Sequence, residues 1–216
     1  MDAVRAGGRR SFTLIELLVV IGIIAVLAGL TVPAISAVRR RSQVSSTTSL
    51  LQRLALALEQ YENDFGDYPP SRFRAAGLGK SNGLNEGSEC LTRCLTTSRR
   101  SGPYFEFADA ELGNTDGDRI VGVREDPTGS IIRNAELLEV VDAWGNPVAY
   151  LHNAVYGQGA SVSLPREDGE GRAPARVEAD TSGKTGQYRG LTTFQLWSAG
   201  PDALAGTDDD IRIVGE

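Results

Sequence analysis

The sequence predicts an α+β protein in which a long N-terminal helix packs on a small C-terminal antiparallel sheet. Two observations predict it. An apolar run near the N-terminus continues into an amphipathic helical pattern, and short strand-like segments occur near the end of the chain. Because one stripe of the helix and one face of the sheet must both be buried, we expect them to form two layers of one domain.

The helix begins with an apolar run from Phe12 to Val38 that carries one charge, Glu16. About 20 apolar residues in a helix cross a hydrocarbon core of ~30 Å, so the run is long enough to span a membrane. An ionisable side chain at the centre of such a helix costs roughly 2.5–3.5 kcal/mol, and less near an end. We therefore expect the carboxylate of Glu16 to have a partner or a function.

A possible partner follows from the basic residues before the run, Arg5, Arg9 and Arg10. Removal of this short leader would leave a free α-amine at the new N-terminus, close to Glu16 in another copy of the same helix. Such an ion pair would join two subunits.

The string S-F-T-L-I-E after the arginines resembles the processing site of the type IV pilin and pseudopilin superfamily. The resemblance implies that a dedicated prepilin peptidase cuts between Ser11 and Phe12 and methylates the Phe12 amine. The family usually has Gly before the cut, where this chain has Ser11. Pro33 also matches a proline common in the family, and we expect it to bend or locally open the helix.

Two alternatives account for the apolar run differently. An ordinary signal peptide would be cut after Ser36, but its apolar part is typically about 7–15 residues and contains no carboxylate. A plain single-pass anchor explains the length and leaves Glu16 unexplained. The mature N-terminus separates the three interpretations: Phe12 indicates pilin-type processing, Ala37 a signal peptide, and Met1 or Asp2 an unprocessed anchor.

Beyond the run, apolar residues recur at helical intervals of three and four, which predicts one buried stripe. They are Leu51, Leu54, Leu58, Tyr61 and Phe65. Two prolines after Tyr68 end the helix. The predicted organisation is a basic leader at 1–11, a transmembrane and polymerisation helix at 12–38, an amphipathic helix at 39–65 and a globular α+β domain at 66–216.

Within that domain the pattern predicts one short helix and three strands. The helix covers Glu89 to Thr97, and the strands cover Val148 to His152, Leu191 to Trp197 and Ile211 to Val214. The segments 76–88 and 157–189 are rich in glycine or charge and are expected to be loops.

Composition narrows the function. With 22 basic and 28 acidic residues the net charge is −6, which argues against nonspecific binding of nucleic acid. Cys90 and Cys94 are expected to pack as buried thiols, and the sequence does not decide whether they form a disulfide. Since no nucleophile motif or phosphate-binding loop accompanies the only histidine, His152, we do not expect an enzyme.

The string D-A-W-G-N-P at 142–147, interpreted from its residues as a structural turn, is followed by L-W-S-A-G-P-D and D-D-I. Together they resemble the C-terminal pattern of the major pseudopilin of type II secretion, whose corresponding loop binds calcium. The resemblance implies a calcium site in this chain, because a hard cation relieves the repulsion between carboxylates in one loop. The alternative is a solvated acidic turn. The implied ligands are side chains of Asp202, Asp209 and Asp210, the carbonyl of Leu204 and a group from Thr207.

A second acidic stretch places Asn114, Asp116, Asp118 and Glu125 at the first, third, fifth and twelfth positions of a possible calcium loop. Arg119 stands at the sixth position, where such loops need Gly. We interpret the stretch as a β-turn with acidic residues and keep these four side chains as a second metal candidate.

Taken as a whole, the resemblance implies a structural subunit of a periplasmic pseudopilus that helps drive protein export by type II secretion. The precursor would sit in the bacterial inner membrane with its C-terminal domain in the periplasm. The implied partners are further copies of the chain, other pseudopilins, the prepilin peptidase and the inner-membrane assembly platform. A type IV pilin or minor pilin for adhesion, motility or DNA uptake is the first alternative, and a membrane-tethered binding domain that does not polymerise is the second.

Overall fold

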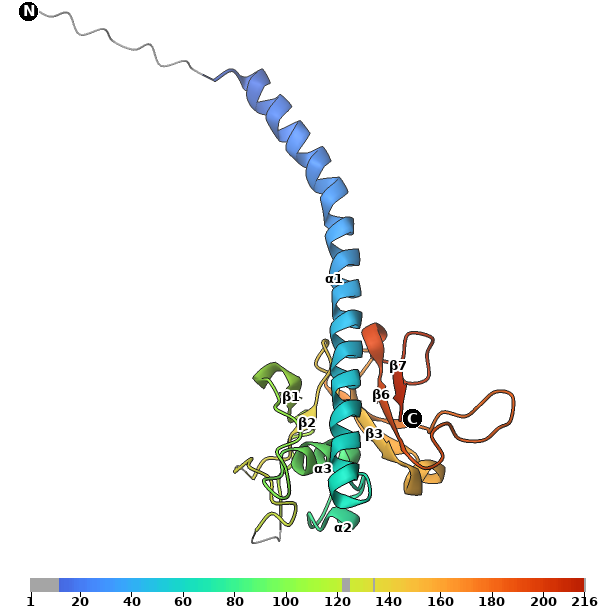
Figure 1. Cartoon of the computed structure of the whole chain (residues 1–216). Helices are drawn as coiled ribbons and strands as arrows, with labels where there is room; N and C mark the ends of the chain where they lie inside the picture. The colour runs from blue at the N-terminus through green and yellow to red at the C-terminus, as the bar shows by residue number, and fades with distance from the viewer. Residues whose placement is uncertain (1–11, 122–124, 134, 216) are drawn as a thin grey trace, which may run out of the picture. The chain divides into compact units, whose positions relative to one another are not determined.

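The computed structural model describes residues 12–121, 125–133 and 135–215 (Figure 1). The long helix, α1, covers Leu14–Phe65, and the predicted boundaries are correct to within two residues. The backbone stays helical through Pro33, so the helix does not open there, and a bend, the other expected effect of this proline, stays a prediction. Pro33 removes one donor from the hydrogen-bond ladder, and the turns on both sides remain helical. Ser11 and the rest of the leader lie outside the described residues.

The chain divides into two compact units, Met1–Ser42 and Gln43–Glu216. In the first unit the large apolar side chains between Leu14 and Leu27 are exposed, from 44 % for Val20 to 78 % for Leu14. Within the described residues, none of the helices combines the length and the apolar character needed to cross a membrane.

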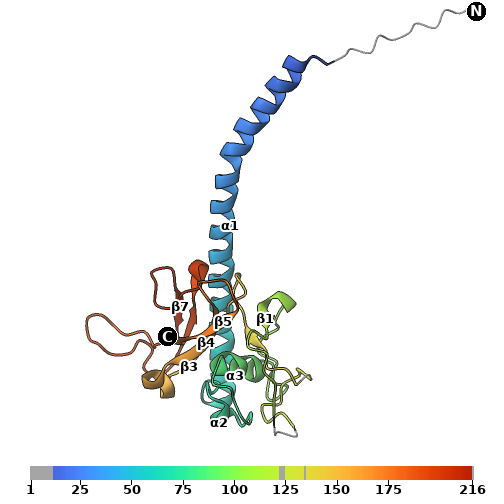
Figure 2. The same cartoon turned by 180° about the vertical axis from the view of Figure 1, so that it is seen from behind.

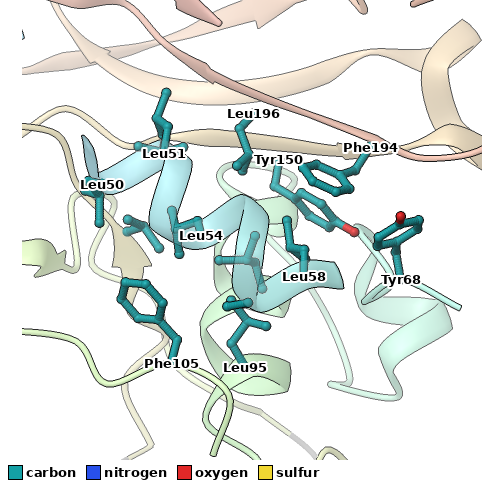
Figure 3. Close-up of a cluster of buried hydrophobic side chains, with 14 residues drawn as sticks. Leu50, Leu51, Leu54, Leu58, Tyr68, Leu95, Phe105, Tyr150, Phe194 and Leu196 are labelled. Carbon is teal, nitrogen blue, oxygen red and sulfur yellow. The ribbon is translucent and has the colours of Figure 1, made fainter. Parts of the chain in front are cut away.

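The second unit is built around the C-terminal half of α1. Leu51, Leu54 and Leu58 are fully buried, as the stripe predicts, while Tyr61 is half-buried and Phe65 lies at the exposed end. Figure 3 shows these leucines facing aromatic and aliphatic side chains from the rest of the unit. Their main partners are Leu95, Phe105, Tyr150, Phe194 and Leu196.

Two short helices follow α1. They are α2 at Phe73–Ala76 and α3 at Glu86–Leu95. The predicted helix from Glu89 to Thr97 is confirmed, with its start three residues earlier and its end two residues earlier than expected. Cys90 and Cys94 lie on α3 as free, buried thiols.

Among the residues that the structure describes, the strand pairs are all antiparallel and form three small sheets. Their order is β1-β2, β3-β6-β7 and β4-β5. The strands are β1 (Leu112–Gly113), β2 (Glu139–Val140), β3 (Ala149–His152), β4 (Ala160–Pro165), β5 (Arg172–Val177), β6 (Phe194–Ser198) and β7 (Ile211–Val214). The three predicted strands are confirmed as β3, β6 and β7, and β6 begins later than expected. Figure 2 shows β3, β4 and β5 from behind.

The prediction that 157–189 is a loop is wrong, because this segment contains the hairpin of β4 and β5. Val162 and Leu164 of β4 and Val177 of β5 are buried. The apolar residues alternate with serine along β4, which is a strand signal. This strand signal is obscured because glycines and charged residues dominate the composition of 157–189. They lie in the hairpin tip and in the segment after β5. The segment 76–88 is mostly irregular, as expected, but α3 already begins within it.

The turn at 142–146 connects β2 to the sheet of β3, β6 and β7. Oδ1 of Asp142 accepts hydrogen bonds from the backbone N–H groups of Trp144 and Asn146, both at 2.9 Å. Its Oδ2 accepts a hydrogen bond from the hydroxyl of Ser198 on β6 at 2.7 Å. Burial raises the pKa of the Asp142 carboxyl, and these hydrogen bonds oppose the shift. The segment is thus a structural turn.

The buried stripe of α1 generates a paired prediction. Leu54→Ala should lower the free energy of unfolding by about 2–5 kcal/mol, because it leaves a cavity in the core. Leu56→Ala, at a side chain 66 % exposed on the same helix, should change it by no more than about 0.5 kcal/mol. Urea unfolding followed by near-UV circular dichroism measures both. Equal losses would contradict the packing described for α1.

Candidate functional site

The first candidate site is the start of α1, where Thr13 and Glu16 form a capping box. The Thr13 hydroxyl accepts a hydrogen bond from the Glu16 N–H at 3.2 Å. Oε2 of Glu16 in turn accepts from the backbone N–H and the hydroxyl of Thr13, at 2.9 and 2.8 Å. This reciprocal pattern satisfies N–H groups that a helix start leaves without partners.

The capping box gives Glu16 a local structural role that our sequence reasoning missed. The signal was present in the sequence, because Thr-x-x-Glu before an apolar run is a capping-box signature. A negative charge in the first turn also interacts favourably with the helix dipole. Glu16 remains exposed, so a neighbouring copy of the chain can still approach it. Phe12, the expected new N-terminus, is 73 % exposed.

We call the exposed apolar side chains between Phe12 and Leu27 the apolar face of α1. They include Leu14, Leu17 and Ile24, each more than half exposed. Single exposed apolar residues are normal on a protein surface, but a continuous set of this extent marks a site of contact with protein or lipid. The second candidate site is therefore this face.

The predicted calcium loop lies between β6 and β7, and its side chains are largely engaged with one another. Oδ1 of Asp202 accepts from the Leu204 N–H at 2.8 Å. Asp209 accepts from the Asp202 N–H at 3.2 Å and from the Thr207 hydroxyl at 2.6 Å. These hydrogen bonds hold the loop in shape.

Asp210 differs from the other two aspartates of this loop. Its Oδ2 pairs with Arg212 at 2.7 Å and accepts from the Gly206 N–H at 3.1 Å, while its Oδ1 is buried with no hydrogen bond. Within the described ranges, ligand oxygens of Asp202, Asp209 and Asp210 do not all lie within 4.8 Å of one another. Calcium in this loop stays a prediction.

The four residues of the second metal candidate take different roles in the structure. Asn114 accepts from the N–H groups of Gly117 and Asp118, at 2.8 and 3.1 Å, so it closes the turn that we expected there. Glu125 is exposed and lies outside the group of acids described next.

Asp116 instead gathers with two glutamates from other elements. One ligand atom from each of Asp116, Glu89 of α3 and Glu139 of β2 lies within 4.8 Å of the others. Our sequence reasoning missed both glutamates. No local signal could have found them, because they come from segments far apart in the chain.

Comparison with known proteins gives two kinds of match. A family model matches near the N-terminus, and two curated relatives each match about a third of the chain. Residues 7–32 match the family model described as the prokaryotic N-terminal methylation motif. The chain is 37 % identical over 70 residues to the type IV wide pilus major component PilA4 of Thermus thermophilus, and 36 % identical over 73 residues to a fimbrial protein of Neisseria meningitidis. These matches support the type IV pilin superfamily.

The matched regions are partial. They cover 32 % and 34 % of this chain, and 53 % and 42 % of the two relatives, so the chain spans about half the length of the curated relatives it matches. Both relatives are named as components of fibres, and neither name describes an enzyme. No solved structure is significantly similar to the chain.

Proposed function

We propose that this protein is a structural subunit of a type IV pilin-like filament, and more specifically of a periplasmic pseudopilus that serves type II secretion. The observation that carries the proposal is that α1 is one helix with an exposed apolar face in its first part and a fully buried stripe in its last part. The buried stripe holds the globular unit, and the apolar face is left for sister copies.

The energetics favour assembly once the helix leaves lipid. Burial of one Leu or Ile side chain stabilises by about 1.5–3 kcal/mol relative to exposure to water. A few such side chains therefore outweigh the roughly 2.5–3.5 kcal/mol that a buried carboxylate costs. On this account the apolar face supplies the affinity between subunits. Glu16, through the Phe12 amine of the next subunit, supplies the register, which is the best-attested use of buried charge.

The secretion assignment rests on the C-terminal resemblance, D-A-W-G-N-P followed by L-W-S-A-G-P-D. The names of the two relatives favour the alternative of a type IV pilin or minor pilin equally well. In both cases the precursor would sit in the inner membrane, be cut before Phe12 by the prepilin peptidase, and be assembled on an inner-membrane platform together with other subunits.

Calcium in the loop between β6 and β7 is a further part of this proposal. The buried Oδ1 of Asp210, which has no hydrogen bond, supports it. The carboxylates of Asp202 and Asp209 would have to turn from their present donors toward the ion. Its role would be to hold the loop of the globular unit, not to take part in a reaction.

Two variants separate the capping role of the first turn from its role in assembly. Glu16→Gln keeps the capping box, since Gln serves at this position as well as Glu, but removes the charge. We expect membrane insertion and cleavage before Phe12 to be unchanged and the yield of sheared or purified filaments to fall at least about 10-fold. Thr13→Val keeps the charge and loses the cap, which costs about 0.5–2 kcal/mol at the helix start, and it should still form filaments.

Electron microscopy with N-terminal sequencing of the mature protein measures both variants. Normal filament yield from Glu16→Gln, together with poor yield from Thr13→Val, would show that the first turn matters as a helix cap and not as an ionic contact.

Deletion of the gene distinguishes secretion from a surface pilus. A pseudopilus subunit should be needed for the release of exoproteins and not for surface fibres, because its filament stays in the periplasm. Exoprotein release and surface fibres should be scored in the same strain. Normal release with loss of fibres would favour the pilin alternative.

A further inference from the structure

Glu89, Asp116 and Glu139, which gather in the globular unit, are joined by a fourth carboxylate, that of Asp118, which interacts with Glu89. We call Glu89, Asp116, Asp118 and Glu139 the buried acid cluster. Glu89 lies in the first turn of α3, Asp116 and Asp118 lie in the turn after β1, and Glu139 is the first residue of β2. α3 packs against β2, and β1 pairs with β2 (Figure 1), so three separate segments meet here.

The spacing of the cluster suits one large cation. Ligand oxygens of Glu89, Asp116 and Glu139 all lie within 4.8 Å of one another. Calcium binds oxygen at about 2.3–2.6 Å, so two oxygens on opposite sides of one ion are separated by roughly 4.6–5.2 Å. An ion placed between the three oxygens would therefore lie close to its usual coordination distance from each of them.

Two of the carboxylates are oriented by donors on one oxygen only. Oε1 of Glu139 accepts from the amide of Asn85 at 3.1 Å and from both the N–H and the hydroxyl of Thr115. Oδ2 of Asp116 accepts from the amides of Asn82 and Asn85, at 3.0 and 3.2 Å. The other oxygen of each carboxylate is buried with no hydrogen bond. Outer groups that orient a carboxylate and leave one oxygen available are typical of metal sites.

Glu89 is the independent observation that points to a ligand. Its side chain is fully buried, and no N–H or hydroxyl group of the described residues donates to its carboxylate oxygens; the polar group that meets it is another carboxyl, that of Asp118. Oδ1 of Asp118 is likewise buried and has no hydrogen bond. A buried carboxylate without a donor is costly, and such groups are normally paired or bound to a metal.

No base of the described residues forms a direct ion pair with the cluster. Among residues 12–121, 125–133 and 135–215, no arginine or lysine lies within ion-pair distance of any of the four side chains. Two arginines act on it electrostatically from farther away, Arg93 on Glu89 and Arg172 on Glu139 and Asp116. Buried carboxylates without a direct ion pair are compensated by a bound cation or by retained protons.

We propose that the buried acid cluster is a binding site for a divalent cation, with calcium as the ion that its chemistry suits best. The ligands on offer are carboxylate oxygens from three segments, in an irregular arrangement that calcium tolerates. Magnesium demands octahedral geometry and usually retains several waters, for which a buried cluster of this kind is less suited. The ion would fasten α3 to β2 and to the turn after β1.

The competing explanation is a proton shared between Glu89 and Asp118, whose carboxyl groups interact directly. The two explanations differ in what calcium does. An ion bound only to the folded protein raises its melting temperature with concentration. A shared proton makes the melting temperature insensitive to calcium at this site.

The test uses the full-length protein in detergent, stripped with a chelator and titrated with calcium chloride. Calorimetry counts the ions, and circular dichroism measures the melting temperature. The variants are Glu89→Gln and Glu139→Gln in the cluster, Asp209→Asn in the loop between β6 and β7, and Glu106→Gln at an exposed glutamate as the matched control.

We expect calcium to raise the melting temperature of the wild type by several degrees. Glu89→Gln and Glu139→Gln should each bind one calcium ion fewer and lose the rise in melting temperature that this ion causes. Without calcium, both variants should melt at or above the wild-type temperature, because one carboxylate fewer reduces the repulsion within the cluster. Asp209→Asn and Glu106→Gln should keep this ion. Asp118→Asn replaces either cluster variant that does not fold.

The proposal is overturned if the wild type binds no calcium, or if the cluster variants keep the full calcium-dependent rise. If only Asp209→Asn loses the bound ion and the calcium-dependent rise, the ion lies in the loop between β6 and β7. None of these outcomes bears on filament assembly, which depends on residues 12–38.

Discussion

The account depends on one constraint: a single continuous helix has to satisfy two different environments. Around Leu54 the side chains of α1 are buried within their own chain, whereas around Leu17 they are exposed. An isolated chain can cover the second set with lipid, and a polymer can cover it with other copies. Cleavage before Phe12 would let the chain exchange the first covering for the second. The globular unit, which contains the last part of α1, would remain available for the surface of the proposed filament.

Glu16 has a partner within its own helix. From sequence alone, a carboxylate in an apolar helix is expected to need a counterion on another molecule. The capping box with Thr13 satisfies part of that need within the helix itself. The proposed intersubunit ion pair would therefore add to an already ordered first turn. This order would reduce the conformational entropy that docking otherwise costs.

Much of the fold could be predicted because its signals are local. The period of the stripe at Leu51, Leu54 and Leu58, and the alternation near Ile211, reflect the geometry of one helix and one strand. The hairpin of β4 and β5 was missed because the acidic residues around Glu167 outweigh the short alternation at Val162. The buried acid cluster could not be predicted, since only the packing of α3 on β2 brings Glu89 to Glu139.

Assembly as proposed requires sister subunits to cover the apolar face of α1. Photocrosslinking in intact membranes, with a photoreactive residue in place of Ile24, shows what covers this face. We expect a ladder of adducts at multiples of the subunit mass, which disappears when cleavage before Phe12 is blocked. Adducts to lipid alone, with no ladder in cells that carry the complete assembly machinery, would contradict it.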